Sequence, residues 1–199
     1  MNGRFPALIA DASRRDRAGA RSGSAAPDQA ADPARRPGPV TPARPPIRIG
    51  VIADTHRLAR PEALAALAGS ELIVHAGDVG GPEVLAALGA VAPVVAVRGN
   101  NDRGPWADAL AETEIVDSGG VRLYVVHDVA QVDFEPAAAG FAAVIAGHSH
   151  KPRCEERGGV LWFNPGSAGP RRFRLPVAVG RLAIALGRVS GEIVELRIP

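Results

Sequence analysis

Short apolar runs that end abruptly in polar residues dominate the central part of this sequence. The first run, residues 47–53, consists mostly of β-branched and small apolar residues without a helical period. Such a run is typical of a strand that is buried on both faces. Asp54 and His56 follow it directly. Because alternate residues at a strand end point the same way, these side chains either hold one ion together or belong to an ordinary polar loop.

The next segments alternate between helical and strand patterns. Residues 61–68 and 81–89 are short helices rich in Ala and Leu, each with a Pro suited to the first helical turn. Residues 71–78 and 91–97 are further apolar strands. The order strand, helix, strand, helix, strand predicts parallel strands joined by right-handed crossovers.

The second half of the chain predicts antiparallel pairs instead. A short helix is expected near residues 135–140, followed by an apolar strand at 142–146. Two hairpins cover residues 114–126 and 153–163, and two further strands cover 177–186 and 193–198. Parallel strands followed by hairpins predict an α/β fold, a four-layer αββα sandwich of two mixed β-sheets flanked by helices.

Composition divides the chain into two parts. Residues 1–46 are rich in Pro, Ala, Arg, Ser and Asp without a sustained period, so we predict a disordered leader there. Residues 47–199 have the length of a single domain of ordinary size. The chain is 46% hydrophobic but only 4% aromatic, so the core is expected to consist of Ala, Val, Leu and Ile.

The net charge of +2 is unevenly distributed. Residues 1–46 hold eight Arg and four Asp, which leaves the domain slightly negative, so no strong nucleic-acid surface is expected on it. The single Cys154 excludes an intrachain disulfide. No apolar run approaches the ~20 residues of a membrane span, and the N-terminus does not suit a signal peptide. We therefore expect a cytoplasmic location and no membrane partner.

Polar residues follow five of the predicted strands, and their types suit metal binding. In open α/β sheets, ligands bind at the carboxyl ends of the strands, so these ends are expected to converge. Four of the five histidines come just past an apolar strand. Carboxylate, imidazole and amide ligands suit Mn, Fe, Ni or Zn, whereas thiolates would indicate structural zinc. The residues concerned are Asp54 with His56, Asp78, Asn100, His127, and His148 with His150.

The ordered set of motifs resembles the calcineurin-like metallophosphoesterase superfamily. The motifs are Asp54-x-His56, Gly77-Asp78, Gly99-Asn100-x-Asp102, His127, Gly147-His148-x-His150 and Asn164-Pro165-Gly166-Ser167. They look most like the small single-domain branch of bacterial and archaeal phosphodiesterases. That branch also includes a non-catalytic scaffold, the retromer subunit of the same fold. The resemblance covers about residues 47–199 and leaves the leader unexplained.

The resemblance implies two divalent metal ions, with Mn preferred and Ni, Fe or Zn as alternatives. One ion would be held by Asp54, His56 and His150, and the other by Asn100, His127 and His148, with Asp78 bridging both. A hydroxide shared by the two ions would attack the phosphorus, so no Ser or Cys nucleophile is required. The predicted catalytic residues are Asn100, Asp102 and His127, with Asp102 expected to orient the loop or a ligand instead of binding metal.

Three positions depart from the family pattern. Asn101 stands where many relatives have a His that is thought to donate a proton to the leaving group, so good leaving groups are expected to be preferred. Arg57 replaces a Gly, and it either contacts a substrate phosphate or points to solvent. Asp128 follows His127 where Gly is usual, which bears on the assignment of His127 and on how open the pocket is.

Other conspicuous residues are expected to have structural roles. His75 lies inside the second strand and is interpreted as a packed core histidine or a support for the ligands. Residues 164–167 are interpreted as a turn that shapes the wall of the site. Four arginines either surround the cleft or are solvated, and the solvated alternative is preferred for each: Arg98, Arg103, Arg171 and Arg172.

The sequence therefore predicts a dinuclear metal-dependent phosphoesterase. A phosphodiesterase that acts on a small phosphodiester is preferred over a phosphomonoesterase. The alternative from another class is a non-catalytic protein-interaction scaffold of the same fold. All seven positions hold metal-competent residues, which favours the enzyme. A Rossmann-type nucleotide-binding domain is disfavoured, because Asp54-Thr55-His56 occupies the turn where its glycine motif would lie. The substrate, the metal and the oligomeric state, including a homo-oligomer, stay open.

Overall fold

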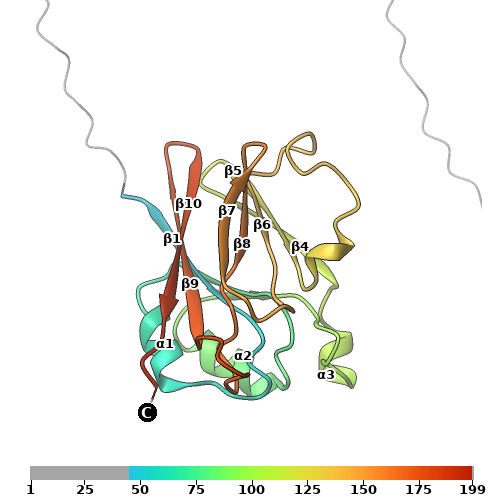
Figure 1. The fold of residues 1–199 in the computed structure, drawn as a ribbon, viewed down its shortest axis with the longest axis vertical. Coiled ribbons are helices and arrows are strands. Elements are labelled where there is room, and N and C mark those ends of the chain that lie inside the picture. Colours follow the sequence, from blue (N-terminus) through green and yellow to red (C-terminus); the bar gives the residue numbers. More distant parts are fainter. Residues whose placement is uncertain (1–44, 199) are drawn as a thin grey trace, which may run out of the picture. The chain divides into compact units, whose positions relative to one another are not determined.

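The computed structural model describes residues 45–198 of the chain. The predicted leader therefore lies outside the described residues, apart from its last two. Within the described part, two five-stranded mixed sheets pack together, with helices on the outer face of the first (Figure 1). The predicted α/β sandwich of two mixed sheets is confirmed.

The first sheet has the strand order β10-β9-β1-β2-β3. Its strands are β1 (Ile47–Ile52), β2 (Leu72–His75), β3 (Val94–Ala96), β9 (Ala178–Ala185) and β10 (Arg188–Glu195). β1, β2 and β3 run parallel, whereas β9 runs antiparallel to both β1 and β10. The carboxyl ends of the three parallel strands therefore lie along one edge of this sheet.

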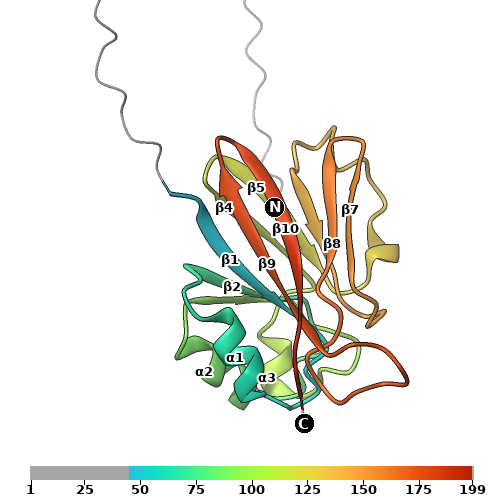
Figure 2. The ribbon, with the colours of Figure 1, turned by 60° about the vertical axis from the view of Figure 1, so that its left-hand side comes forward.

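Two helices cover the outer face of the first sheet (Figure 2). Both α1 (Pro61–Leu67) and α2 (Pro82–Gly89) begin with a proline in the first turn, as predicted. Leu67 and Leu88 pack in one buried cluster with Ile73 of β2, and burying each such side chain contributes about 2 kcal/mol. A short third helix, α3 (Pro105–Asp108), follows the loop after β3.

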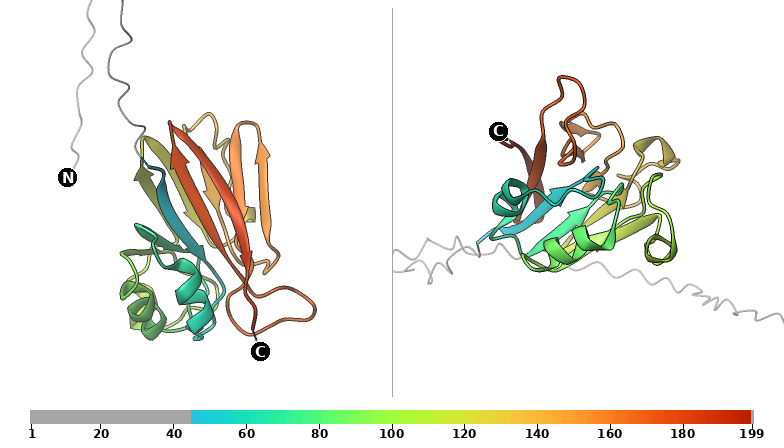
Figure 3. Two further views of the ribbon diagram at one scale, coloured as in Figure 1. Left: turned by 90° about the vertical axis from the view of Figure 1, so that its left-hand side faces the viewer. Right: turned by 90° about the horizontal axis from the view of Figure 1, so that it is seen from below.

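The second sheet has the strand order β4-β5-β6-β8-β7. Its strands are β4 (Thr113–Ser118), β5 (Val121–Val126), β6 (Ala143–Ile145), β7 (Arg153–Arg157) and β8 (Val160–Asn164). β5, β6 and β8 are parallel, and β4 and β7 pair antiparallel at the two edges. The two sheets face each other (Figure 3). One apolar cluster with members from both sheets fills the space between them.

Phe163 of β8 lies in that central cluster and is 2% exposed. Two glycines of the first sheet make room for its ring. A Cβ atom at Gly180 would collide with the ring, and one at Gly191 would lie 2.7 Å from it. The two sheets can therefore close over Phe163 only because these positions lack side chains.

Two elements differ from the sequence predictions. Residues 135–140 form a single turn instead of a helix, because Gly140, with a φ of 79°, ends it at once. The 3₁₀ helix η1 (Val129–Gln131) is the regular helical element of this connection. The last strand begins at Arg188, five residues earlier than predicted, because Leu186 and Gly187 reverse the chain with positive φ angles.

None of the helices between residues 45 and 198 is long and apolar enough to cross a membrane. The cytoplasmic location and the partner assignments stay predictions.

Candidate metal centre

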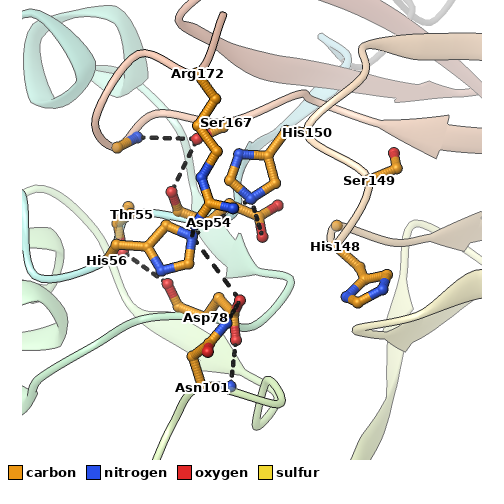
Figure 4. A network of polar contacts seen from close by, with 12 residues as sticks. Asp54, Thr55, His56, Asp78, Asn101, His148, Ser149, His150, Ser167 and Arg172 are labelled. Atoms are coloured by element: carbon orange, nitrogen blue, oxygen red, sulfur yellow. Dashed lines mark hydrogen bonds and ion pairs between the residues drawn. The ribbon is translucent and has the colours of Figure 1, made fainter.

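The polar residues that follow the strands gather at one end of the two sheets. Two groups of side chains each offer ligand atoms that all lie within 4.8 Å of one another. The groups are Asp54, His56 and His150, and Asp54, Asp78 and His127. Figure 4 shows members of both groups, Asp54, His56, Asp78 and His150, converging from different loops. Five of the seven predicted ligands therefore lie in one cluster.

Backbone hydrogen bonds join the first two ligand loops beyond the ends of their strands. The N–H of Asp54 donates to the carbonyl of Gly77, and the N–H of His56 donates to the carbonyl of Asp78, each at 3.0 Å. The φ angles are 53° at Asp54 and 55° at Asp78, and they are also positive at His56, His148 and His150. This conformation costs on the order of 1 kcal/mol or more per residue with a side chain. The surrounding fold therefore holds the ligand loops in shapes that they would not adopt alone.

Asp54 is the strongest indication of a cation in this site. Its side chain is fully buried, and neither carboxylate oxygen has a hydrogen-bond partner among the described residues. Nε2 of His150 lies 3.3 Å from Oδ1. Burying an uncompensated carboxylate costs several kcal/mol. A divalent cation beside Asp54 would supply the compensation, so the residues present fit a metal ion.

The imidazole rings of His56 and His150 lie side by side next to Asp54. Their Nε2 atoms are 3.4 Å apart, and their rings stack with centroids 5.3 Å apart. Burial holds the pKa of His56 below its ordinary value, against the opposing effects of Asp78 and Asp54. Neutral imidazole is the metal-binding form of histidine, so His56 is available as a ligand at neutral pH.

Asp78 belongs to the second group and also faces His56 of the first. Its Oδ1 is 3.5 Å from Nε2 of His127, and its Oδ2 is 3.9 Å from Nε2 of His56. Burial alone would raise its pKa, but hydrogen bonds from His127 and Asn101 hold the pKa of Asp78 well below its ordinary value. Asp78 is therefore an ionised carboxylate with one oxygen toward each group, as a bridging ligand would be.

His127 is held in one tautomer. Its Nδ1–H donates to the carbonyl of Ala76 at 2.8 Å, which leaves Nε2 facing Asp78 and Oδ1 of Asn100, 3.1 Å away. Nε2 donates to Asp78 when the ring is charged, and it offers its lone pair to a metal ion when the ring is neutral. Burial opposes a charge on His127, but Asp78 and the Ala76 carbonyl raise the pKa of the ring above its ordinary value. The surroundings that attract a proton to Nε2 also attract a metal ion.

Asn100 and His148 extend the site toward its rim. Oδ1 of Asn100 is 3.0 Å from Nδ1 of His148. The side chain of His148 is 46% exposed, and Figure 4 shows it set apart from His56 and His150. All seven predicted ligands thus reach the same end of the sheets. Their division between two ions stays a prediction.

Asp102 joins two of the ligand loops through hydrogen bonds to their backbone. It is 6% exposed, and its carboxylate accepts hydrogen bonds from the backbone N–H groups of Val79, Gly80 and Gly99 at 3.2, 2.7 and 2.8 Å. The loop after β2 is therefore joined to the loop after β3. The predicted catalytic role of Asp102 stays a prediction, and this geometry suits positioning of the ligand loops.

His75 is a packed core histidine, as one of the two interpretations expected. Its Nε2 lies 2.9 Å from Oγ1 of Thr55, whose hydroxyl donates to the carbonyl of Val79 at 2.9 Å. Complete burial, assisted by the charge of His127, lowers the pKa of His75 to about 3. His75 is therefore a neutral donor that supports the loop between Asp54 and His56.

The three departures from the family pattern each have a defined place. The amide of Asn101 donates to Oδ2 of Asp78 at 2.6 Å. Arg57 takes the solvent-facing alternative, because its side chain is 75% exposed and its Nε lies 3.7 Å from Glu83. The carboxylate of Asp128 accepts a backbone hydrogen bond at the start of η1.

The turn after β8 packs against the ligand loops, and its predicted role in the wall of the site stays a prediction. Asn164 donates from Nδ2 to the carbonyl of Gly147 at 2.6 Å and accepts from the N–H of Gly166 at 2.9 Å. Arg172, farther along the same connection, is exposed as expected, but its guanidinium also contacts the site. Its Nη2 lies 3.3 Å from Nε2 of His56. The cluster of arginines in residues 171–174 was the only sequence signal for this contact.

A cavity of about 480 Å³ adjoins the outer half of the site. Its wall includes three predicted ligands, Asn100, His127 and His148. Arg103 and Gln131 also line it. The cavity therefore offers a polar space next to the predicted second ion position, of a size that suits a small substrate.

Comparison with known proteins agrees with the geometry. Residues 47–185 match the model of the calcineurin-like phosphoesterase superfamily domain. The chain is 32% identical over 162 residues to a probable metallophosphoesterase of Methanothermobacter thermautotrophicus, covering 75% of this chain and 90% of that protein.

Two solved structures show the same fold. An archaeal phosphodiesterase matches with a TM-score of 0.62 and 23% identity, over 74% of this chain and 99% of that one. Vps29 from Entamoeba histolytica, solved in complex with Zn²⁺, matches with a TM-score of 0.56 and 22% identity, over 75% and 99% of the two chains. With the family model covering most of the described residues, this chain belongs to the calcineurin-like phosphoesterase superfamily.

Proposed function

We propose that this protein is a phosphodiesterase that requires two divalent metal ions. The observation that carries the proposal is the buried carboxylate of Asp54, which lacks a hydrogen-bond partner among the described residues and lies beside two imidazoles. Membership in the superfamily supports hydrolysis of a phosphoric ester in general. The preference for a diester is supported by the likeness in fold to an archaeal phosphodiesterase.

The proposed ligand set is the one that the resemblance implies, and the two groups of side chains support it in part. Asp54, His56 and His150 would hold one ion, and Asn100, His127 and His148 the other, with Asp78 shared. When bound, such a pair supplies a water of lowered pKa and positive charge that offsets the charge on the phosphate oxygens. Nitrogen and oxygen ligands without a thiolate suit Mn, with Ni, Fe or Zn as alternatives.

The surrounding side chains orient these ligands and shape the substrate space. Ala76 fixes the tautomer of His127, and Asn101 fixes the direction of the Asp78 carboxylate. Because the Asn101 amide is engaged with Asp78, it is poorly placed to protonate a leaving group. We therefore expect a preference for diesters whose leaving group is stable as an anion.

The test is hydrolysis of bis(p-nitrophenyl) phosphate by protein stripped with chelator and then supplied with Mn²⁺, Ni²⁺, Fe²⁺ or Zn²⁺. Activity should be absent after stripping, should return with metal, and should exceed that on p-nitrophenyl phosphate. Asp78→Asn keeps the shape of the side chain but removes its charge, and it should abolish activity while metal content falls. Full activity in the stripped protein would refute the proposal.

The second candidate function is a non-catalytic protein-interaction scaffold of the same fold. The structural likeness to Vps29, which was itself solved with Zn²⁺, favours this alternative. Bound metal without hydrolysis of any mono- or diester in a broad screen would favour the scaffold. Loss of metal together with loss of hydrolysis in Asp78→Asn would favour the enzyme.

A further inference from the structure

Arg172 is the only arginine of the described residues with a hydrogen-bond contact to a predicted metal ligand. It comes from the connection between β8 and β9, and Figure 4 shows its side chain reaching down to His56 beside His150. Its Nη2 lies 3.3 Å from Nε2 of His56. The guanidinium therefore lies at the edge of the predicted metal site, and it would lose this contact if Nε2 of His56 bound an ion.

Short contacts at the foot of the connection set the position of Arg172. Ser167 donates from Oγ to the carbonyl of Asp54 at 2.9 Å, and the N–H of Ala168 donates to the carbonyl of Ala53 at 3.1 Å. Gly169 lies so close that a Cβ atom there would collide with the carbonyl of Asp54. Residues 167–169, which precede Arg172, are thus held against the end of β1, where the first two ligands lie.

Arg172 is an exposed side chain, so its charge is available to an anion. No carboxylate of the described residues lies within ion-pair distance of it, whereas Arg57 pairs with Glu83 and Arg98 pairs with Asp108 and Glu112. A guanidinium beside two bound cations would be repelled by them. A phosphate placed between the cations and the guanidinium removes this repulsion, because Arg presents a planar fork of donors to phosphate oxygens.

We propose that Arg172 binds the phosphate of the substrate, donating hydrogen bonds to its non-bridging oxygens from the side of His56. The inference rests on the proposed function and names a residue of the same site. Arg172 would hold the phosphate over the ligand cluster and would stabilise negative charge on its oxygens during hydrolysis.

The experiment compares Arg172→Ala and Arg172→Lys with Arg171→Ala, an exposed neighbour without an ion pair among the described residues. Two quantities are measured in the metal-loaded full chain: the Kd of inorganic phosphate by calorimetry, and KM and kcat for bis(p-nitrophenyl) phosphate. We expect Arg172→Ala to weaken phosphate binding and raise KM by roughly ten- to a hundred-fold, the loss typical of a charged hydrogen bond. Arg172→Lys should recover part of the affinity, and Arg171→Ala should change it less than about three-fold.

Metal affinity, measured in the same variants, distinguishes the possible failures. Unchanged phosphate affinity in Arg172→Ala overturns the proposal. An equal loss of phosphate affinity in Arg171→Ala also overturns it, because the effect would then come from the net positive charge of the segment and not from a direct contact. Tighter metal binding without a change in phosphate binding also overturns it, because Arg172 would then only compete with the ions. If no ester is hydrolysed, the phosphodiesterase proposal fails, but the phosphate calorimetry still decides the role of Arg172.

Discussion

Asn101 donates two hydrogen bonds to Asp78, from its backbone N–H to Oδ1 at 2.8 Å and from its side-chain amide to Oδ2 at 2.6 Å. One residue therefore orients both oxygens of the carboxylate that faces both ligand groups. Asn101→Ala removes only the side-chain bond. We expect metal affinity to fall by about 10- to 100-fold, as for other residues that orient a metal ligand.

Titration of the stripped protein with Mn²⁺ by calorimetry measures this effect. Arg57→Gln is the matched control, because Arg57 is an exposed residue of a neighbouring loop whose ion pair is with Glu83. Its metal affinity should stay within about two-fold of the parent protein. Equal affinities for Asn101→Ala and the control would show that Asp78 needs no support.

Asp54→Asn should change stability in opposite directions with and without metal. Asn tolerates the positive φ of this position and keeps the side-chain shape, while it removes a buried charge that has no hydrogen-bond partner. In chelator, the variant should be more stable by on the order of 2 kcal/mol. In Mn²⁺, the parent protein gains stability by binding the ion, and the variant should not.

Urea unfolding of both proteins, with chelator and with Mn²⁺, tests whether metal reverses their order of stability. If the variant were the less stable protein in chelator, Asp54 would be compensated by the fold alone. The argument for a cation would then lose its main support.

Removal of the Asp102 carboxylate should destabilise the fold itself. Asp102→Ala leaves three backbone N–H groups without their acceptor, and we expect a loss of about 3 kcal/mol in the free energy of unfolding. Asp108→Ala is the comparison, since the side chain of Asp108 is 71% exposed and its loss should cost less than about 0.5 kcal/mol. Similar urea midpoints for the two variants would contradict the positioning role.

His75 should make the protein sensitive to acid. Its pKa is about 3 in the folded state and near 6.5 when unfolded, so the unfolded chain binds more protons as pH falls below 6.5. The stability that depends on a neutral His75 is fully present above pH 6.5 and is lost progressively as the pH falls to about 3. Between pH 7 and pH 5 the loss from this residue is about 2 kcal/mol.

The measurement is the free energy of unfolding in chelator at both pH values for the parent and for His75→Gln. Gln keeps a neutral donor near the position of Nε2 but does not titrate. The difference between pH 7 and pH 5 should therefore shrink in the variant, although its stability at pH 7 is lower. An identical pH dependence in both proteins would exclude His75 as the cause.

The ligand positions were predictable because they follow strand ends. An apolar run that stops at Asp54 or Asp78 marks both a buried strand and the point where its edge meets solvent. Parallel pairing of β1 and β2 then brings these ends together without knowledge of any loop. The same logic placed His127 and His150 correctly, although they come from the second sheet.

Loop geometry was not predictable in this way. Arg172 lies seven residues beyond Pro165. No pattern in the chain shows that Ser167, which precedes it, packs against Asp54. The helix expected at 135–140 failed because a single glycine ended it after one turn. The partners of Asn101 and Asp102 likewise depend on contacts between separate loops, which neither propensity nor periodicity describes.

The backbone bonds from Asp54 to Gly77 and from His56 to Asp78 hold two ligand loops together. In the proposed site the first loop would serve one ion, while Asp78 of the second loop would serve both. Filling the first position would therefore also settle Asp78 for the second ion. Metal uptake by this protein should be cooperative, with a Hill coefficient above one and few molecules that carry a single ion.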